Sequence, residues 1–154
     1  MNIITEEQAT ARQLALPPQG PLDGLSADFI AELQNGGAFV EYNQQVVLSP
    51  GDPIDYISCI VAGRVKVSRI DADYGKAMVA KLGAGEWFGE SNLFLRVSAA
   101  EEIYADGEAV IWTMPTETMR DLFFRESEGV QLLYNFGLLM AQRLAARTPA
   151  PAVS

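Results

Sequence analysis

The residues best suited to chemistry in this sequence are four in a row, Phe88, Gly89, Glu90 and Ser91. A glycine before a helical turn lets backbone N–H groups converge on an anion, and Gly89 is placed to give that approach. The carboxylate of Glu90 can accept hydrogen bonds from a ligand. It can equally cap the first turn of a helix and complement the helix dipole, so a binding role and a structural role both stay open.

The sequence gives little support for a catalytic function. The 154 residues include no histidine, which removes the commonest general base and a common metal ligand. The adjacent carboxylates of Glu101 and Glu102 would point to opposite faces of a strand and could not share a substrate. The single cysteine, Cys59, lies in an apolar stretch, as a buried thiol usually does. We therefore predict that the protein is not an enzyme and uses no cofactor or metal ion.

Charge and hydropathy restrict the partners. The formal charge of −9 opposes approach to the phosphate backbone of a nucleic acid, and the basic residues are scattered singly along the sequence. No apolar run approaches the roughly 20 residues of a membrane-spanning helix. The first residues carry glutamates and no apolar core of a signal peptide. These features predict a cytoplasmic protein without direct binding to nucleic acid or membrane.

The elements that must position these residues are short strands. Between residues 38 and 112, apolar residues alternate at Ile57, Cys59 and Val61, again at Val65 and Val67, and again at Met78, Ala80 and Leu82. Glycine-containing turns separate these runs. Short strands at this spacing indicate a sandwich or roll of antiparallel β-structure.

Helical patterns flank the strands. Residues 5–16 favour a short helix before a proline- and glycine-rich linker, and Ser26 caps an amphipathic helix that stops at residues 35–37. After Pro115, Thr116 is placed to cap a helix that reaches Phe124, and a second helix spans about residues 128–146. We predict an extension and linker over residues 1–21, one domain over 22–146, and a disordered tail over 147–154.

Two stretches resemble the cyclic-nucleotide-binding domain family, the type found in catabolite activators and in regulatory subunits of protein kinase A. Residues 39–67 include a Gly51-Asp52 turn and a glycine turn at Gly63 before a Val-x-Val strand. Residues 82–93 resemble the start of the family's phosphate-binding cassette, with Phe-Gly-Glu intact at residues 88–90. The resemblance implies a mainly β fold with flanking helices: a double-stranded β-helix, or jelly-roll-like β-roll, closed by C-terminal helices. It also implies that Glu90 contacts a ribose hydroxyl.

The second half of the cassette departs from the family. There, an arginine about nine residues after the glutamate pairs with the cyclic phosphate, and a Ser or Thr three residues further on completes the site. In this sequence the corresponding residues are Ala99 and Glu102, with Ala100 and Glu101 between them. A charge-assisted bond to phosphate contributes about 1.5–3 kcal/mol, so its loss would lower affinity by roughly one to two decades.

Arg96 is the nearest candidate to replace the missing arginine. It lies three residues before Ala99 and could enter the pocket if the loop were rearranged, or it could be a solvated loop residue. Ser98 could likewise supply a hydroxyl. The candidate ligand-binding set is therefore Phe88, Gly89, Glu90, Ser91, Arg96, Ser98, Ala99, Ala100 and Glu102.

These observations favour a stand-alone regulatory or interaction module with a degenerate pocket and a protein partner. The alternative is a cyclic-nucleotide receptor that uses Gly89, Glu90 and Arg96 in a modified geometry. The helix over residues 128–146 is apolar around most of its circumference, with a narrow polar stripe at Gln131, Asn135 and Gln142. Its excess apolar surface predicts a homodimer in which Phe136, Leu139 or Met140 cross the two-fold axis, unless the roll and the helix after Ser26 cover both faces.

Overall fold

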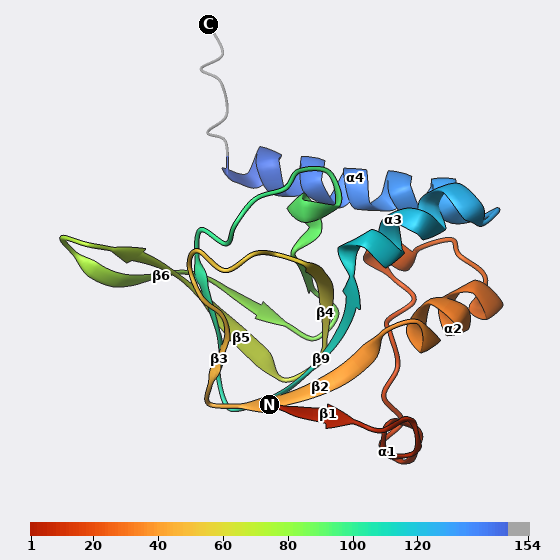
Figure 1. Cartoon of the computed structure of the whole chain (residues 1–154), viewed down its shortest axis with the longest axis horizontal. Helices are drawn as coiled ribbons and strands as arrows, with labels where there is room; N and C mark the ends of the chain where they lie inside the picture. Colours follow the sequence, from red (N-terminus) through yellow and green to blue (C-terminus); the bar gives the residue numbers. More distant parts are fainter. Residues whose placement is uncertain (148–154) are drawn as a thin grey trace, which may run out of the picture.

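Nine strands form two antiparallel sheets in the part of the chain that the computed structural model describes, residues 1–147 (Figure 1). The five-stranded sheet has the order β1-β2-β9-β4-β7, and the four-stranded sheet has the order β3-β8-β5-β6. The strands are β1 (Asn2–Ile4), β2 (Ala38–Asn43), β3 (Val46–Leu48), β4 (Tyr56–Ala62), β5 (Arg64–Asp71), β6 (Gly75–Gly83), β7 (Trp87–Phe88), β8 (Glu102–Ala105) and β9 (Glu108–Pro115).

Helices lie at both ends of the chain and one short turn lies between the strands. They are α1 (Glu6–Ala11), η1 (Gly20–Leu22), α2 (Ala27–Asn35), η2 (Glu90–Leu93), α3 (Thr116–Arg125) and α4 (Gly129–Arg147), where η marks a 3₁₀ helix. The predicted mainly β roll with C-terminal helices is confirmed. Of the predicted tail, Arg147 ends α4, and residues 148–154 lie outside the described part.

The alternation of side chains along the strands builds two apolar cores. On β4, Cys59 faces the helices while Ile60 faces the other sheet. On β9, Trp112 likewise faces the helices and Ile111 faces the other sheet. The core between the sheets consists of Ile60, Val65, Val67, Phe88, Ile103 and Ile111. Strands β4 and β9 are therefore buried on both faces, which explains their nearly continuous apolar sequences.

The N-terminal segment is part of the fold. Strand β1 pairs with β2, with Ile3 opposite Val40, and Leu16 and Leu22 are buried in the helix-side core. The predicted helix is shorter than residues 5–16, because it begins after a capping box at Thr5 and ends at Ala11. The residues predicted as an extension and linker thus complete one edge of the five-stranded sheet.

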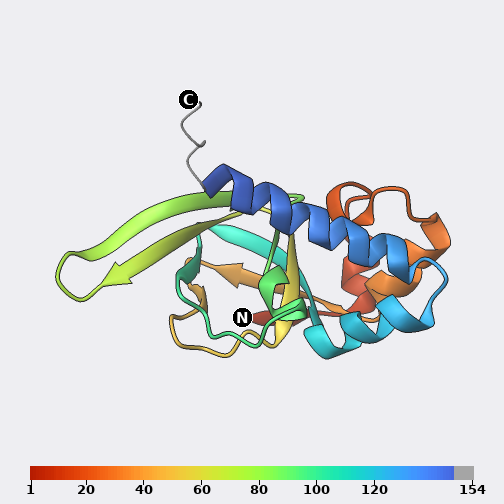
Figure 2. The ribbon, with the colours of Figure 1, turned by 90° about the horizontal axis from the view of Figure 1, so that it is seen from above.

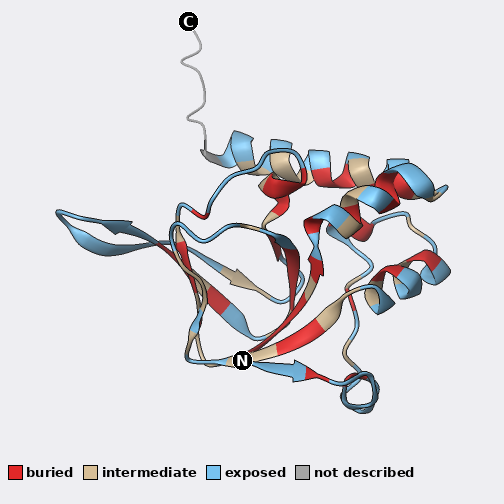
Figure 3. Cartoon of the chain, viewed as in Figure 1, coloured by how far each residue is buried: buried red, intermediate tan, exposed pale blue. Residues whose placement is uncertain are grey.

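Strands β5 and β6 form a hairpin that projects from the body of the molecule (Figures 1 and 2). The alternating Met78, Ala80 and Leu82 do lie on a strand, as predicted. Met78 and Ala80 are nonetheless exposed, because β6 is the outer strand of its sheet and its only neighbour is β5. Figure 3 shows most of this hairpin as exposed.

Helix α4 runs across the roll from α3 toward the base of the hairpin (Figure 2). Its inner side is fixed by Phe136, which is fully buried and meets Trp87 edge-on at 5.4 Å between ring centroids. Helix α3 begins differently from the prediction. Pro115 occupies the N-cap, and the hydroxyl of Thr116 donates to the carbonyl of Asp55 at 3.3 Å.

Candidate functional site

A cavity of about 700 Å³ opens between the four-stranded sheet, the loop after η2 and the end of α4. Most of its wall is apolar. From the sheets and α4 it is lined by Leu48, Val67, Arg69, Val79, Ala80, Leu82, Phe88, Ile103, Arg143 and Ala146, and from the loops by Ile54, Gly89, Glu90, Ser91, Val97, Ser98, Ala99, Ala100 and Glu101. The structure thus brings together seven of the nine predicted ligand-binding residues, all except Arg96 and Glu102.

Gly89 makes the turn at the floor of the cavity. Its φ is +85°, and a Cβ at this position would lie 2.6 Å from the carbonyl oxygen of Tyr56. Both facts require glycine there. The turn leads directly into η2 and places the Glu90 side chain, which is 10% exposed, at the cavity wall.

The carboxylate of Glu90 is bound by a residue that the sequence analysis did not identify. The guanidinium of Arg143 on α4 donates to Glu90 Oε1 and, through its other nitrogen, to the carbonyl oxygen of Trp87. The available signal was an arginine in an otherwise apolar helix. Sequence separation hid the pairing, since these residues are 53 positions apart. Glu90 therefore already has a hydrogen-bond partner within the protein. Any ligand that contacts the Glu90 carboxylate would share that carboxylate with Arg143.

Ala99, which the sequence resemblance aligns with the phosphate-binding arginine, is held in place by two backbone hydrogen bonds. Its N–H donates to the carbonyl of Asp52 at 2.8 Å, and its own carbonyl accepts from the N–H of Gly51 at 2.8 Å. The Ala99 side chain is buried. The loop therefore presents a methyl group to the cavity at this position instead of a cation.

Arg96 does not line the cavity. It lines a second pocket of about 470 Å³ on the other side of the same loop, together with Arg120 and Asn92. Val97 and Ser98 line both pockets, so the loop is a wall between them. The role considered for Arg96 inside the binding cavity does not fit this placement.

Glu102 is also placed differently from the prediction. It lies on β8, where its carboxylate accepts from Lys76 Nζ of β6 at 2.7 Å, and it is not part of the cavity wall. Its neighbour Glu101 lines the cavity instead. The physical reason is the alternation of a strand, which sends adjacent side chains to opposite faces.

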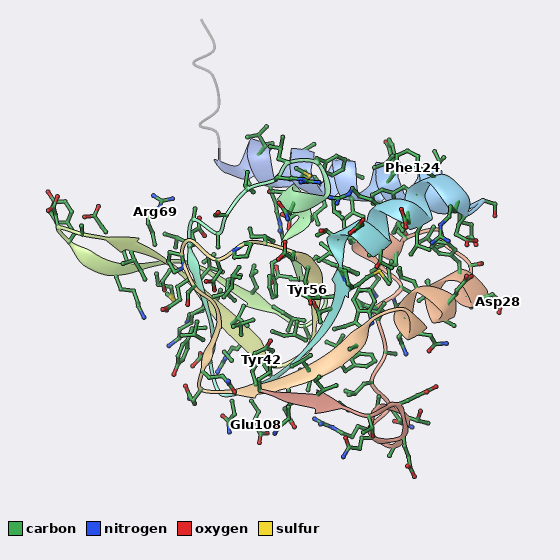
Figure 4. All side chains as sticks on the ribbon, in the orientation of Figure 1. Asp28, Tyr42, Tyr56, Arg69, Glu108 and Phe124 are labelled. Atoms are coloured by element: carbon green, nitrogen blue, oxygen red, sulfur yellow. The ribbon has the colours of Figure 1, made fainter. Side chains whose placement is uncertain are left out.

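Arg69 is the other cavity residue that the sequence analysis missed. It lies on β5 and is labelled above the hairpin in Figure 4. Within residues 1–147, Arg69 makes no ion pair, whereas Arg143 is committed to Glu90. The charged groups of the cavity are thus Glu90 with Arg143, and Glu101 and Arg69 near the rim. No group of three or more potential metal ligands occurs in this described part.

The candidate dimer residues divide into buried and half-buried ones. Phe136 is fully buried in the core and cannot cross a two-fold axis, which corrects that choice. Leu139 and Met140 are half-buried, and Leu139 packs on the helix-side core. The predicted polar stripe misled this choice, because Asn135 is itself buried and donates to the carbonyls of Pro21 and Asp23 at 2.9 and 2.8 Å. The exposed apolar residues of α4 lie on the side of the helix opposite Phe136.

The stretch that contains the roll and the cassette is also the one that matches a known protein family. The sequence pattern that defines the cyclic nucleotide-binding domain matches residues 42–126 of the 154. The chain belongs to the cyclic nucleotide-binding domain family. Searching the curated proteins gives no significant match for this domain. No helix within residues 1–147 is long and apolar enough to cross a membrane.

Solved structures share the fold of this cyclic nucleotide-binding domain. Thermus thermophilus catabolite activator protein matches with a TM-score of 0.75 and 21% identity, over 83% of this chain and 59% of that one. The N-terminal domain of a transcriptional regulator from Streptomyces coelicolor A3(2) gives 0.72 and 22%, over 88% and 96%. A cAMP-binding acyltransferase from Mycobacterium smegmatis gives 0.67 and 20%, over 88% and 40%. At these identities the likeness concerns the fold alone, and this chain spans 59% of the Thermus protein.

Proposed function

We propose that this cyclic nucleotide-binding domain is a non-catalytic regulatory module that acts through a protein partner and does not bind cyclic nucleotides tightly. The observation that carries the proposal is the pairing of the Ala99 backbone with Gly51 and Asp52 at 2.8 Å on both sides. A buried methyl group is thus held at the position that the resemblance assigns to the phosphate-binding arginine. The only basic residue of the same loop, Arg96, lies in the other pocket.

The charges around the cavity favour the same conclusion. A cyclic phosphate would meet the carboxylate of Glu101 at the wall, and Glu90 is already bound by Arg143. Because the cassette loop offers this cavity no cation, a phosphate placed beside Ala99 would lose its hydration without a charge-assisted hydrogen bond from the loop in return. The residues of the cavity also supply no histidine, cysteine or other nucleophile with an adjacent base.

The test is calorimetric titration of the purified protein with cyclic AMP, cyclic GMP and cyclic di-GMP. We expect dissociation constants no lower than about 100 μM for each ligand. The variant Ala99→Arg restores the cation, and its affinity for cyclic AMP should rise by at least about tenfold. Low-micromolar binding by the unaltered protein would reject the proposal.

Two further variants keep this test interpretable. Ala100→Arg adds an arginine at an exposed residue of the same cavity wall, so it covers the case in which Ala99→Arg does not fold. Ala77→Arg adds the same charge on the exposed strand β6, outside the cavity wall, and should leave affinity unchanged. If all three variants gain affinity equally, net charge rather than the cassette controls binding.

A second candidate function is a cyclic-nucleotide receptor with a modified site. It is favoured by Arg69, a cation that lines the cavity and makes no ion pair within residues 1–147. A phosphate held by Arg69 would approach from the hairpin rather than from the cassette loop. Here Arg69→Ala would abolish binding and Arg96→Ala would not, whereas the degenerate pocket predicts little effect of either change.

We further propose a homodimer through the outer face of α4. Exposed apolar and small residues share this face of the helix: Val130, Tyr134, Gly137, Leu138, Ala141 and Ala145. The small residues let a second helix approach closely, and a symmetric pairing would cover the stripe with its own copy. Figure 3 shows this face as exposed along α4.

Light scattering tests the dimer at tens of micromolar protein. We expect twice the chain mass of 16.7 kDa. Leu138→Glu should return the protein to one chain mass without unfolding it, because Leu138 is 45% exposed in the single chain. Val46→Glu, at an exposed valine on β3, serves as the matched control and should stay dimeric. A mass of 16.7 kDa for the unaltered protein would contradict the dimer.

A further inference from the structure

Basic side chains that are scattered singly in the sequence meet on the β5–β6 hairpin. Residues 64–81 carry five of the eleven Lys and Arg residues and only two aspartates, a formal charge of +3 in a chain of −9. The basic residues are Arg64, Lys66, Arg69, Lys76 and Lys81. The hairpin is therefore more basic than the rest of the chain, although Asp106 pairs with Arg64 and Lys66, and Glu102 pairs with Lys76.

Two of these cations face each other. Lys66 on β5 lies directly opposite Lys81 on β6, and since Val65 and Val67 are buried between the sheets, Lys66 points outward. Like charges in a cross-strand pair are unfavourable. Asp106 offsets part of this charge, with 3.6 Å between its carboxylate and Lys66 Nζ. Lys81 makes no ion pair within residues 1–147.

The same hairpin presents an open strand edge. Strand β6 has nine residues and pairs only with β5, so the backbone N–H and C=O groups of its other side have no strand partner. Met78 and Val79 add apolar surface, with exposures of 54% and 46%. The outer part of the hairpin projects away from the body of the molecule (Figures 1 and 2), and residues 75–81 of β6 are exposed.

We infer that β6 is the docking edge for an extended acidic segment of a partner protein, which adds to the sheet as a further strand. This inference rests on the proposed function and names the chemistry of its partner. The backbone groups of β6 give the segment its direction and register, while Lys66 and Lys81 select for carboxylates on its outward side. A nucleic acid or a lipid surface could bind the lysines through its negative charge, but neither can pair with the backbone of β6 as a further strand.

The probe is a capped synthetic peptide of alternating Glu and Val, as long as the nine residues of β6 and labelled for fluorescence anisotropy. We expect saturable binding at low salt that weakens as ionic strength rises. A Lys-Val peptide of the same length should not bind. The same Glu-Val peptide, N-methylated at alternate residues, keeps its charge but loses its strand donors, and it should not bind either.

Protein variants locate the site. Lys66→Glu combined with Lys81→Glu should weaken peptide binding by at least about tenfold. Arg12→Glu combined with Arg125→Glu makes the same charge change just after α1 and at the end of α3, away from the hairpin, and should leave binding within about twofold of the unaltered protein. Circular dichroism of each variant checks that the roll is folded.

The inference is overturned if the Glu-Val peptide does not bind, or if the N-methylated peptide binds as well as the unmodified one. It is also overturned if a DNA duplex or vesicles of anionic lipid compete for the same lysines as strongly as the peptide does. None of these measurements contains a cyclic nucleotide. Tight binding of cyclic AMP would therefore reject the proposed function without deciding whether the peptide binds β6.

Discussion

The guanidinium of Arg143 bonds both the carboxylate of Glu90 and the carbonyl of Trp87, and thereby fixes the end of α4 to the floor of the cavity. Both side chains are largely enclosed, with exposures of 27% for Arg143 and 10% for Glu90. A charge held in such surroundings depends on its partner. The hydrogen bonds of Arg143 therefore attach the C-terminal helix to the wall of the cavity.

Replacing Arg143 should destabilise the fold. Arg143→Ala leaves the Glu90 carboxylate without its cation, and we expect a loss of about 2–3 kcal/mol in the free energy of unfolding, measured by urea denaturation. Arg143→Lys keeps the charge but loses one of the two hydrogen bonds, so its effect should be intermediate. Arg125→Ala, an exposed arginine on α3, is the control. Equal effects of Arg143→Ala and Arg125→Ala would show that the pair contributes nothing.

Asn135 should be equally sensitive although it looks like a surface residue in sequence. Its amide donates to the carbonyls of Pro21 and Asp23, which join η1 to α4. Asn135→Ala leaves these acceptors unpaired and should cost about 1–3 kcal/mol in urea denaturation. Gln142→Ala, an exposed change on the same helix, should cost less than about 0.5 kcal/mol. If the two variants unfold at the same urea concentration, the amide does not hold the segment.

Cys59 should not react in the folded protein. It is fully buried, and burial raises the pKa of its thiol to about 12, so almost no thiolate forms at pH 8. We expect no labelling by iodoacetamide under native conditions and complete labelling in denaturant, followed by mass spectrometry. Rapid labelling of the native protein would mean that β4 opens far more readily than its place between β9 and β7 implies.

Glu128 should make stability depend on pH in the acidic range. Its carboxylate accepts from the backbone N–H and the hydroxyl of Ser26 at 2.7 and 2.6 Å, and the hydroxyl bond and then the N–H bond hold its pKa below the ordinary 4.5. A depressed pKa in the folded state stabilises the protein above the ordinary value, and this contribution is lost as the pH falls through the folded value.

The measurement compares the unfolding free energy of the unaltered protein with that of Glu128→Gln across pH 7 to about 3. The difference should be largest at neutral pH and shrink toward zero in acid. Glu117→Gln, a carboxylate at the start of α3, is the control and should show a smaller pH dependence. A difference that stays constant over the whole range would contradict the assignment to this carboxylate.

The fold could be predicted because its signals are local. The alternation at Ile57, Cys59 and Val61 and the glycine turn at Gly63 specify strands, and these match the observed β4 and β5. The same holds for the long C-terminal helix. Its orientation was not predictable from periodicity, since the burial of Asn135 depends on two carbonyls more than 100 residues away in sequence.

The candidate site could be predicted only in part, for a related reason. The cassette residues Gly89 and Glu90 line the cavity as the motif implied, because a contiguous motif carries its own geometry. Arg69 and Arg143 come from other elements, and no spacing connects them to the cassette. The facing lysines of the hairpin were missed for another reason: the register of β5 with β6, which places Lys66 opposite Lys81, was not assigned from the sequence.

The order of strands in the five-stranded sheet sets the pace at which this chain must fold. Strand β9 lies between β2 and β4, with Ala38 opposite Thr113 and Tyr56 opposite Pro115, so the sheet closes only after most of the chain is synthesised. Such distant pairings form slowly, on a scale of roughly milliseconds to seconds, whereas a hairpin such as β5–β6 forms within about microseconds. The open edge of β6 therefore exists long before the core that supports it. Mutual repulsion between the lysines of two unfinished chains then keeps those edges from joining during the wait, which protects the protein from aggregation at its most vulnerable stage.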